Sequence, residues 1–246
     1  MEMESPALQV FEYDCPVAVI GDIHGCADLL EELLTKLGPD VPILVVGDLV
    51  DRGPDSKRVL DLLVKRKAKG VRGNHEEWFR QWVRGEGFDT FALNPIVGGI
   101  ATLQSYGIET KSPGEIEQCV YLVPKAHRDL VNRLAVVGDL RVQGETYWMV
   151  HAGVSEKVPQ EWRTAPALAE SLAKFHVQDC LWGTHPPRKA PVLDRPVLMG
   201  HLPQKHGPLD LGHVVALDVG AGYPDGYGLA AILLPSREFV VVRSRK

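Results

Sequence analysis

Three short apolar runs early in the chain end in the same way, and this repetition constrains the fold more than any other feature. Each run stops at a glycine, and residues of the types that bind metal ions follow at once. The segments are 17–25 (VAVIGDIHG), 43–53 (ILVVGDLVDRG) and 71–76 (VRGNHE). Continuous apolar runs of this length are typical of strands that are buried on both faces. We therefore predict that three strand ends deliver their side chains to one point.

The intervals between these segments have helical periodicity. Between residues 26 and 37 leucines recur at a helical spacing, and Gly38 and Pro39 end the pattern. The interval 55–69 has a similar apolar stripe, and its basic end is typical of a helix C-terminus. Strands and helices that alternate at this spacing predict βαβ units and a largely parallel sheet.

The rest of the chain predicts further elements of both kinds. We expect an edge strand at 8–13, helices at 76–83 and 124–134, a hairpin with arms at 141–143 and 146–150, a helix within 155–175, an irregular loop at 182–196, and strands at 196–199, 214–218, 229–234 and 239–242. The last three strands are predicted to form an antiparallel second sheet. Glycines are frequent in residues 84–114, which we interpret as a helical insertion over the active site. The prediction is one domain at 1–246, with a helical cap at about 76–136.

Composition and charge narrow the class of protein. The 246 residues, of which 45% are hydrophobic, are enough to bury a substantial core. A formal net charge of -5 argues against binding to a nucleic-acid duplex or a membrane. We expect neither a secretory signal nor a membrane span, because no apolar run approaches roughly 18 residues. The four cysteines are scattered, so a disulfide framework is not indicated and a cytoplasmic location is expected. The oligomeric state is left open.

Residues of metal-binding types stand at the ends of the apolar runs. They are Asp22, His24, Asp48, Asn74, His75, His151 and His201. Asp22 and His24 are two residues apart, so on an extended strand they would face the same side. A single histidine after a strand is more often structural than ligating, and the other five histidines are interpreted in that way. The recurrence of the pattern, in order along the chain, is what indicates a site.

The chemistry of this set points to two metal ions. Carboxylate oxygens and imidazole nitrogens suit manganese, iron or zinc, and we expect Mn²⁺ to be preferred. The set has no cysteine, which argues against a structural zinc cage. It contains enough ligands for two ions that share one bridging carboxylate. Two ions about 3.5–4 Å apart can hold a phosphate between them and turn a bridging water into hydroxide. The sequence thus predicts a two-metal phosphoesterase.

The motifs that carry these residues resemble, in order, those of the calcineurin-like metallophosphoesterases. They are Gly-Asp-Ile-His-Gly, Gly-Asp-Leu-Val-Asp-Arg-Gly, Gly-Asn-His-Glu, His-Ala-Gly and Gly-His. The second and third narrow the resemblance to the phosphoprotein phosphatase superfamily, and it runs from residue 17 to about 244. Its most similar branches are the small bacterial and phage-type serine/threonine phosphatases and the symmetrical dinucleoside tetraphosphatases. The resemblance implies an α/β fold (α+β in some schemes), a four-layer β-sandwich flanked by helices, with metals at the strand ends.

The resemblance also implies a ligand set. One metal would be held by Asp22 and His24, the other by Asn74, His151 and His201, and Asp48 would bridge the two.

Three further roles follow from the same resemblance. His75 would be the general acid that protonates the leaving alkoxide, and Asp51 would orient its ring. Arg52 would bind phosphate oxygens through its planar fork. No covalent phosphoenzyme is implied, since water is the nucleophile.

The sequence departs from the family pattern at two positions. Phage-type members resemble Leu181-Trp182 but have arginine where this chain has Thr184. Arg188 and His185 are the candidates for the missing phosphate contact, with a structural role as the alternative for each. Leu202 follows Gly200-His201 where the family usually has threonine. Neither departure affects a predicted metal ligand, but both bear on the choice of substrate.

Three functions are weighed on this basis. The leading prediction is a serine/threonine protein phosphatase that hydrolyses phosphomonoesters by direct attack of a metal-bridging hydroxide. The alternative is a symmetrical bis(5′-nucleosyl)-tetraphosphatase, which cleaves an anhydride, and the expected partner is accordingly a phosphorylated protein or a dinucleoside polyphosphate. A tetraphosphatase needs a base-stacking pocket and extra cations, which Trp78, Trp82, Arg80 and Arg84 could supply. A catalytically inactive scaffold is the remote third case, since every ligand is present.

Overall fold

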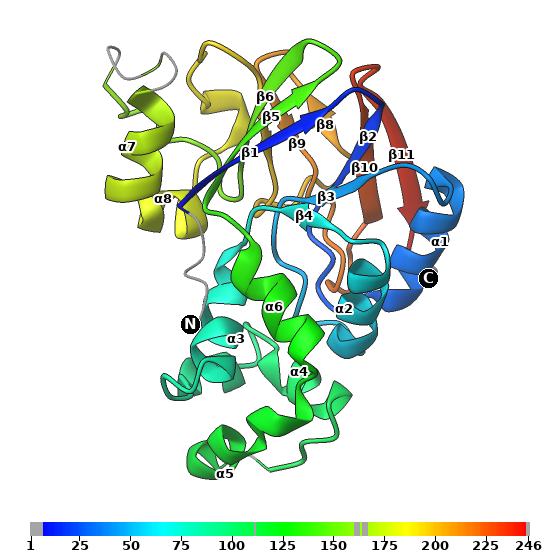
Figure 1. The fold of residues 1–246 in the computed structure, drawn as a ribbon, viewed down its shortest axis with the longest axis vertical. Coiled ribbons are helices and arrows are strands. Elements are labelled where there is room, and N and C mark those ends of the chain that lie inside the picture. The colour runs from blue at the N-terminus through cyan, green and yellow to red at the C-terminus, as the bar shows by residue number, and fades with distance from the viewer. Residues whose placement is uncertain (1–6, 111, 160–162, 164–166, 245–246) are drawn as a thin grey trace.

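The structure is a computed structural model that describes residues 7–110, 112–159, 163 and 167–244. Two mixed sheets form its centre (Figure 1). The five-stranded sheet has the order β11-β10-β2-β3-β4, with bounds Glu238–Arg243, Gly228–Leu234, Val17–Ile20, Ile43–Val45 and Lys69–Gly70. The six-stranded sheet has the order β1-β5-β6-β7-β9-β8, with bounds Leu8–Tyr13, Val137–Val142, Glu145–Val150, Val197–Met199, Val214–Ala216 and Leu209–Asp210.

The two faces of β2 explain why its sequence is a continuous apolar run. Val17 and Val19 point into the core between the two sheets, where they pack with residues such as Met149 of the other sheet. Ala18 and Ile20 point the other way, into a core shared with the helices α1 and α2. A strand buried on both faces has no polar side, so alternation is lost.

Three hydrophobic cores separate four layers. The first lies between the five-stranded sheet and the helices α1 (Ala27–Leu37) and α2 (Ser56–Lys65). The second lies between the sheets, and the third lies between the six-stranded sheet and α7 (Ala167–Phe175). Helices therefore cover both outer faces, as Figure 1 shows, and the predicted α/β four-layer sandwich is confirmed.

The predicted βαβ units are present, with one boundary corrected. β2, β3 and β4 pair in parallel, and α1 and α2 connect them. The helix expected at 55–69 ends at Lys65, and Lys69 and Gly70 form the edge strand β4. Lys67 has a positive φ of 52°, so the chain leaves the helix there and turns back to the sheet. The basic run 65–69 therefore spans the turn and the edge strand, whereas we had predicted a helix end.

The late strands do not form the predicted antiparallel second sheet. β9 joins the six-stranded sheet, parallel to β7, whereas β10 and β11 join the other sheet and β10 pairs antiparallel to β2. All of these strands bury apolar residues against neighbours on at least one face, so their sequences do not reveal which sheet they enter. The hairpin of β5 and β6 and the edge position of β1 are confirmed.

Further helices gather at one end of the molecule, below the sheets in Figure 1. They are α3 (Asn74–Val83), η1 (Thr90–Leu93), α4 (Gly99–Ser105), α5 (Pro113–Gln118), η2 (Cys119–Leu122) and α6 (Lys125–Arg133). The short helix α8 (Val177–Trp182) and the turn η4 (Pro187–Lys189) follow α7. Among the described helices, none has the length and apolar character needed to cross a membrane.

Candidate metal centre

The segments that follow β2, β3, β4, β6 and β7 meet at one place and carry all the predicted ligands, with Asn74 and His75 at the start of α3. The backbone there is unusual, because His24, Asp48, Asp51, Arg52 and His201 all have a positive φ, between 44° and 71°. Residues other than glycine seldom adopt this conformation, which costs of order 1–3 kcal/mol each and concentrates at functional sites. Asp22 and His24 lie beyond the end of β2, so the expected strand alternation does not explain why both face the site. The turn that follows the strand positions them instead.

Asp48 lies at the centre of the cluster, with buried histidines on both sides. Its Oδ2 lies 3.5 Å from Nε2 of His24 and 3.9 Å from Nε2 of His75. Its Oδ1 lies 3.3 Å from Nε2 of His151. Two groups of side chains could each hold a metal ion, His24 with Asp48 and His75, and Asp48 with His151 and His201. Asp48 belongs to both groups, which is the position that a bridging carboxylate requires.

Acceptor atoms converge around His151. Its Nδ1–H donates to the carbonyl of Val46 at 2.8 Å, which leaves the Nε2 lone pair facing inward. Nε2 lies 3.2 Å from Oδ1 of Asn74 and 3.2 Å from Nδ1 of His201. Burial lowers the pKa of His151, but the negative charge of Asp48 and Asp22 outweighs it and raises the pKa to about 10. The surroundings of Nε2 therefore attract positive charge, and a metal ion bound there would take the place of the proton. These oxygen and nitrogen atoms together would bind a cation, and a divalent ion fits them.

The other side of the centre contains Asp22, His24 and Arg52. Nδ1 of His24 donates to the carbonyl of Val50 at 3.0 Å, so its Nε2 faces Asp48. Arg52 contacts that Nε2 through Nη1, so an ion at His24 requires the guanidinium to turn aside. Oδ2 of Asp22 accepts from the backbone N–H of His201 at 2.9 Å, while its buried Oδ1 has no partner among the described residues. A buried carboxylate oxygen without a partner fits a metal ligand.

His75 has the surroundings of a positioned acid. Nδ1 donates to Oδ2 of Asp51 at 2.8 Å, and Oδ1 of Asp51 accepts from the hydroxyl of Thr102 at 2.6 Å. Burial lowers the pKa of His75, but the charge of Asp48 and the bond to Asp51 outweigh it and raise the pKa above its usual value. The ring thus favours its protonated form. His75 also lies close enough to His24 and Asp48 to be a metal ligand with them. The role of His75 as the acid therefore stays a prediction.

Two further residues of the centre were not assigned from the sequence. Glu76 is fully buried, and its carboxylate accepts backbone N–H bonds of 2.8 Å each from Asp48, Leu49 and Gly73. Glu76 belongs to the quoted motif, so the motif was the available signal. Tyr223 lies under Arg52, whose guanidinium carbon is 4.5 Å from the ring centroid. It lies far from Arg52 in the chain, and no local pattern indicated the contact.

The motif glycines allow close approach. A Cβ at Gly73 would lie 2.1 Å from Oδ1 of Asp48, and one at Gly200 would lie 2.0 Å from Oδ1 of Asp22. Any side chain at either position would displace a predicted ligand. The glycine before each ligand pair is therefore part of the site.

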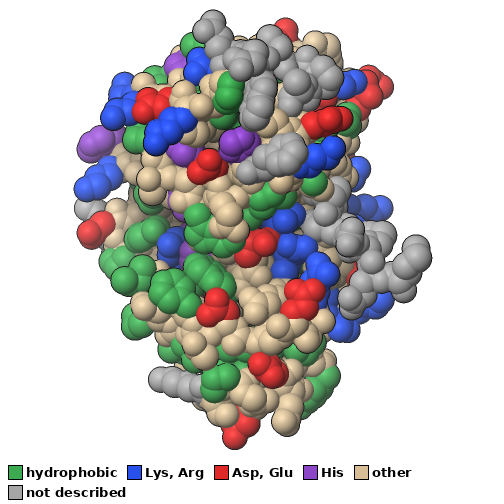
Figure 2. Space-filling model, turned by 90° about the vertical axis from the view of Figure 1, so that its left-hand side faces the viewer, with side chains coloured by type: hydrophobic (Ala, Val, Ile, Leu, Met, Phe, Trp, Pro, Cys, Tyr) green, Lys and Arg blue, Asp and Glu red, His purple; other side chains and the backbone are tan. Residues whose placement is uncertain are grey.

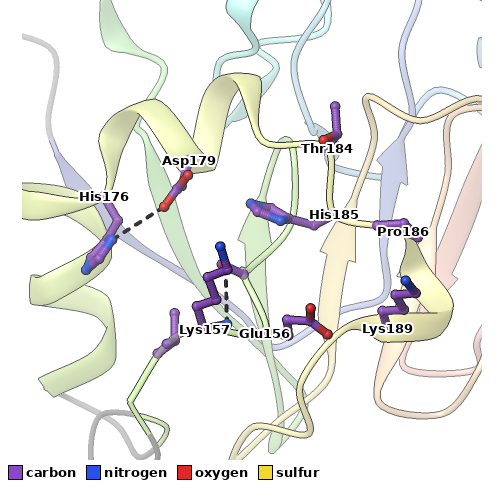
Figure 3. Close-up of a pocket in the computed structure, with 10 residues that line it drawn as sticks. Glu156, Lys157, His176, Asp179, Thr184, His185, Pro186 and Lys189 are labelled. Carbon is purple, nitrogen blue, oxygen red and sulfur yellow. Dashed lines mark hydrogen bonds and ion pairs between the residues drawn. The ribbon is translucent and has the colours of Figure 1, made fainter.

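A pocket of about 520 Å³ lies beyond His151 and contains one of the two candidates for the second phosphate contact. Figure 3 shows His185 there among Glu156, Lys157 and Asp179. Nε2 of His185 is buried and has no hydrogen-bond partner among the described residues. Arg188 lies on η4 and is exposed. The phosphate role of either residue stays a prediction.

Comparison with known families agrees with this centre. The model of the family described as "Calcineurin-like phosphoesterase" matches residues 15–238. The match includes every predicted ligand and all the strands except β1 and most of β11.

Individual relatives fall into two kinds. The asymmetrical bis(5′-nucleosyl)-tetraphosphatase PrpE of Oceanobacillus iheyensis is 26% identical over 94% of this chain and 93% of its own length. Serine/threonine-protein phosphatase 1 of Salmonella typhimurium is 50% identical, but over 25% of this chain and 30% of its own length. A crystal structure described as a proposed diadenosine tetraphosphatase superposes with a TM-score of 0.62 at 20% identity, covering 97% of this chain and 98% of that one. The last comparison shows the fold alone.

Proposed function

Since this chain belongs to the calcineurin-like phosphoesterase family, we propose that this metal-dependent phosphoesterase hydrolyses a dinucleoside tetraphosphate. The observation that carries the proposal is the similarity to a tetraphosphatase along more than nine-tenths of both chains. Sequence similarity to the Salmonella typhimurium protein phosphatase covers only 25% of this chain. The comparisons thus favour the tetraphosphatase alternative of the sequence analysis over its leading prediction. That alternative was a symmetrical enzyme, whereas the full-length relative is asymmetrical. We therefore propose cleavage to a nucleoside monophosphate and a nucleoside triphosphate.

The side chains of the centre support hydrolysis by direct attack of water on phosphorus. Divalent ions, of which we propose Mn²⁺, would supply charge neutralisation and activation of that water. Asp22, His24, Asp48, Asn74, His151 and His201 would hold them. Arg52, whose guanidinium packs on the ring of Tyr223, would bind the phosphate oxygens once it turns aside from His24.

His75 would move the proton. As the new P–O bond forms, the bond from phosphorus to the leaving oxygen breaks, and the electron pair stays on that oxygen. His75, charged through its bond to Asp51, would donate its Nε2 proton there. A leaving phosphate anion is less basic than a serine alkoxide, so an anhydride needs this proton less than a phosphoserine does.

A substrate panel with Mn²⁺ tests the proposal. We expect kcat/KM for diadenosine tetraphosphate to exceed that for a phosphoserine peptide by at least about tenfold, with AMP and ATP as products. Two molecules of ADP would indicate symmetrical cleavage instead. Faster phosphate release from the peptide would overturn the proposal in favour of the protein phosphatase, the second candidate. The Asp48→Asn variant serves as the control for contaminating hydrolases.

A further inference from the structure

A second cavity lies between α3 and α8, beside the metal centre. Its volume of about 510 Å³ is within the range of pockets that hold a small organic ligand. Rings, amides and guanidinium groups line it, namely Trp78, Arg80, Gln81, Arg84, Gln178 and Trp182, together with three carboxylates. Figure 2 shows the side of the molecule on which α3 and α8 lie, where basic side chains gather near mid-height beside acidic and hydrophobic ones.

Trp78 connects this pocket to the metal centre. Its ring stands perpendicular to the imidazole of His75, with the ring centroids 5.3 Å apart, and the same side chain lines the pocket. One indole ring therefore separates the pocket from the proposed acid. A polyphosphate bound at the metals could extend past this ring and place its nucleoside in the pocket.

The uncharged side chains are suited to a nucleobase. Trp78 and Trp182 are both partly exposed and offer π-faces on which a base can stack. Gln81 and Gln178 offer amides, which can donate to and accept from the edge of a purine at the same time. Rings with amides are the combination that recognises a base.

The charged side chains are suited to the adjoining phosphates. Arg80 is 7% exposed, and its Nη1 donates to Glu77 at 2.7 Å. Its buried Nε has no hydrogen-bond partner among the described residues, which is uncommon for a buried donor and leaves part of its donor capacity unused. Arg84 pairs with Glu86 at 2.8 Å and is also partly exposed. The three acids that line the pocket, Glu77, Glu86 and Asp89, outnumber the two arginines, so the pocket is not a site for a free anion.

Two other candidates for the base site, the side chain of Trp82 and the pocket of Figure 3, lack this combination of exposed rings and amides. Trp82 is buried, and its Nε1 donates to the carbonyl of Ile116 at 2.9 Å, so it belongs to the core and is not a stacking surface. The pocket of Figure 3 has Lys157 and Lys189 but no Trp, Tyr or Phe among its described lining residues. It suits phosphates and not a base.

We propose that the pocket between α3 and α8 binds a purine nucleoside of the substrate, stacked on Trp78 and Trp182, with Arg80 directed to the adjoining phosphate. This proposal rests on the proposed function and adds the site that would distinguish a dinucleotide from a simple phosphoester.

The test compares two substrates in two pocket variants. Trp182→Ala removes a stacking ring, and we expect KM for diadenosine tetraphosphate to rise by at least about fivefold, the lower end of base-stacking effects. The ratio of its kcat/KM to that for p-nitrophenyl phosphate should fall by a similar factor, and Trp182→Phe should restore most of the loss. Gln178→Ala, at an exposed position, should raise the same KM by about threefold or more. Tyr121→Ala removes an exposed ring outside the pocket and is the matched control.

The outcomes separate the pocket from the proposed function. Wild-type protein that does not prefer diadenosine tetraphosphate contradicts the function itself. If wild-type protein does prefer diadenosine tetraphosphate, but Trp182→Ala and Gln178→Ala both match the Tyr121→Ala control, only the proposed role of the pocket is overturned. Should Trp182→Ala fail to fold, Gln178→Ala decides the question by the same ratio. Quenching of tryptophan fluorescence by AMP in chelator-treated protein gives a second readout that does not depend on turnover. We expect Gln178→Ala to weaken it.

Discussion

At the residue scale, the histidines of the centre differ in what fixes their rings. His24 and His151 each donate Nδ1–H to a backbone carbonyl, whereas His75 donates to the carboxylate of Asp51. A carbonyl acceptor at Nδ1 fixes the orientation in which Nε2 can bind a metal, and a carboxylate acceptor stabilises a charged ring that can give up a proton. The hydrogen-bond partners thus support ligand roles for the first two and an acid role for the third.

His75→Asn tests that distinction. We expect both metals to remain and kcat to fall by roughly 10²–10⁴-fold on phenyl phosphate, because its leaving group needs the proton. The loss should be much smaller on p-nitrophenyl phosphate, whose leaving group is a better one, and Asp51→Asn should show a weaker form of the same bias. Steady-state kinetics on this matched pair, with metal analysis, is the measurement. Equal losses on both substrates, or lost metal, would contradict the role.

Glu76→Gln tests the carboxylate that holds three backbone N–H groups. The amide has one acceptor oxygen, so at least one buried donor should lose its partner. We expect unfolding free energy to fall by about 1.5–3 kcal/mol, measured by urea denaturation. The control is Glu117→Gln, since Glu117 accepts a single exposed backbone bond from Phe88. A loss no greater than that of the control would show that the buried bonds of Glu76 contribute little.

At the element scale, α4 is tied to the centre through one side chain. Thr102 accepts from the backbone N–H of Asp51 at 2.9 Å and donates to its carboxylate. The backbone N–H of Arg52 also donates to the carbonyl of Gly98, just before α4. We propose that the predicted cap, residues 76–136, acts here as a support that sets the position of Asp51 and Arg52.

Thr102→Val keeps the shape of that side chain but removes its hydroxyl. We expect kcat to fall by about tenfold, the value of one hydrogen bond to a charged group, with a small change in KM. The fall in kcat should again be larger on phenyl phosphate than on p-nitrophenyl phosphate, since the substitution acts through His75. Thr102→Ser keeps the hydroxyl and should stay near wild type. A Thr102→Val enzyme with normal kcat on both substrates would contradict the support role.

Elements could be predicted from the sequence to different degrees. The strands β2, β3, β6 and β7 that precede ligands were clear, because apolar runs mark them, whereas Lys69 of β4 was assigned to a helix. The end of α2 was not clear, because residues 65–69 continue a helical composition through a turn that depends on Lys67 adopting a positive φ. The sequence also could not predict which sheet β9 and β10 join. Both strands are apolar, and their sheet is determined by pairing with strands that are distant in the chain.

At the scale of the whole molecule, the two sheets bring residues from distant parts of the chain to one edge. Motifs could predict which residues meet, but not how they meet. The contact of Tyr223 with Arg52 and the bond from Thr102 to Asp51 depend on packing between elements that no local pattern records.

All four cysteines are free in the structure. The cytoplasmic location stays a prediction.

Metal stoichiometry is the most direct test of the two-metal centre. We predict that active protein contains two divalent ions per chain by elemental analysis, and that chelation abolishes turnover until Mn²⁺ is restored. Asp48→Asn removes the charge between the two ions, so it should lose at least one of them and several orders of magnitude in activity while remaining folded by circular dichroism. Active protein without a transition metal, or near-normal metal content and turnover in Asp48→Asn, would contradict it.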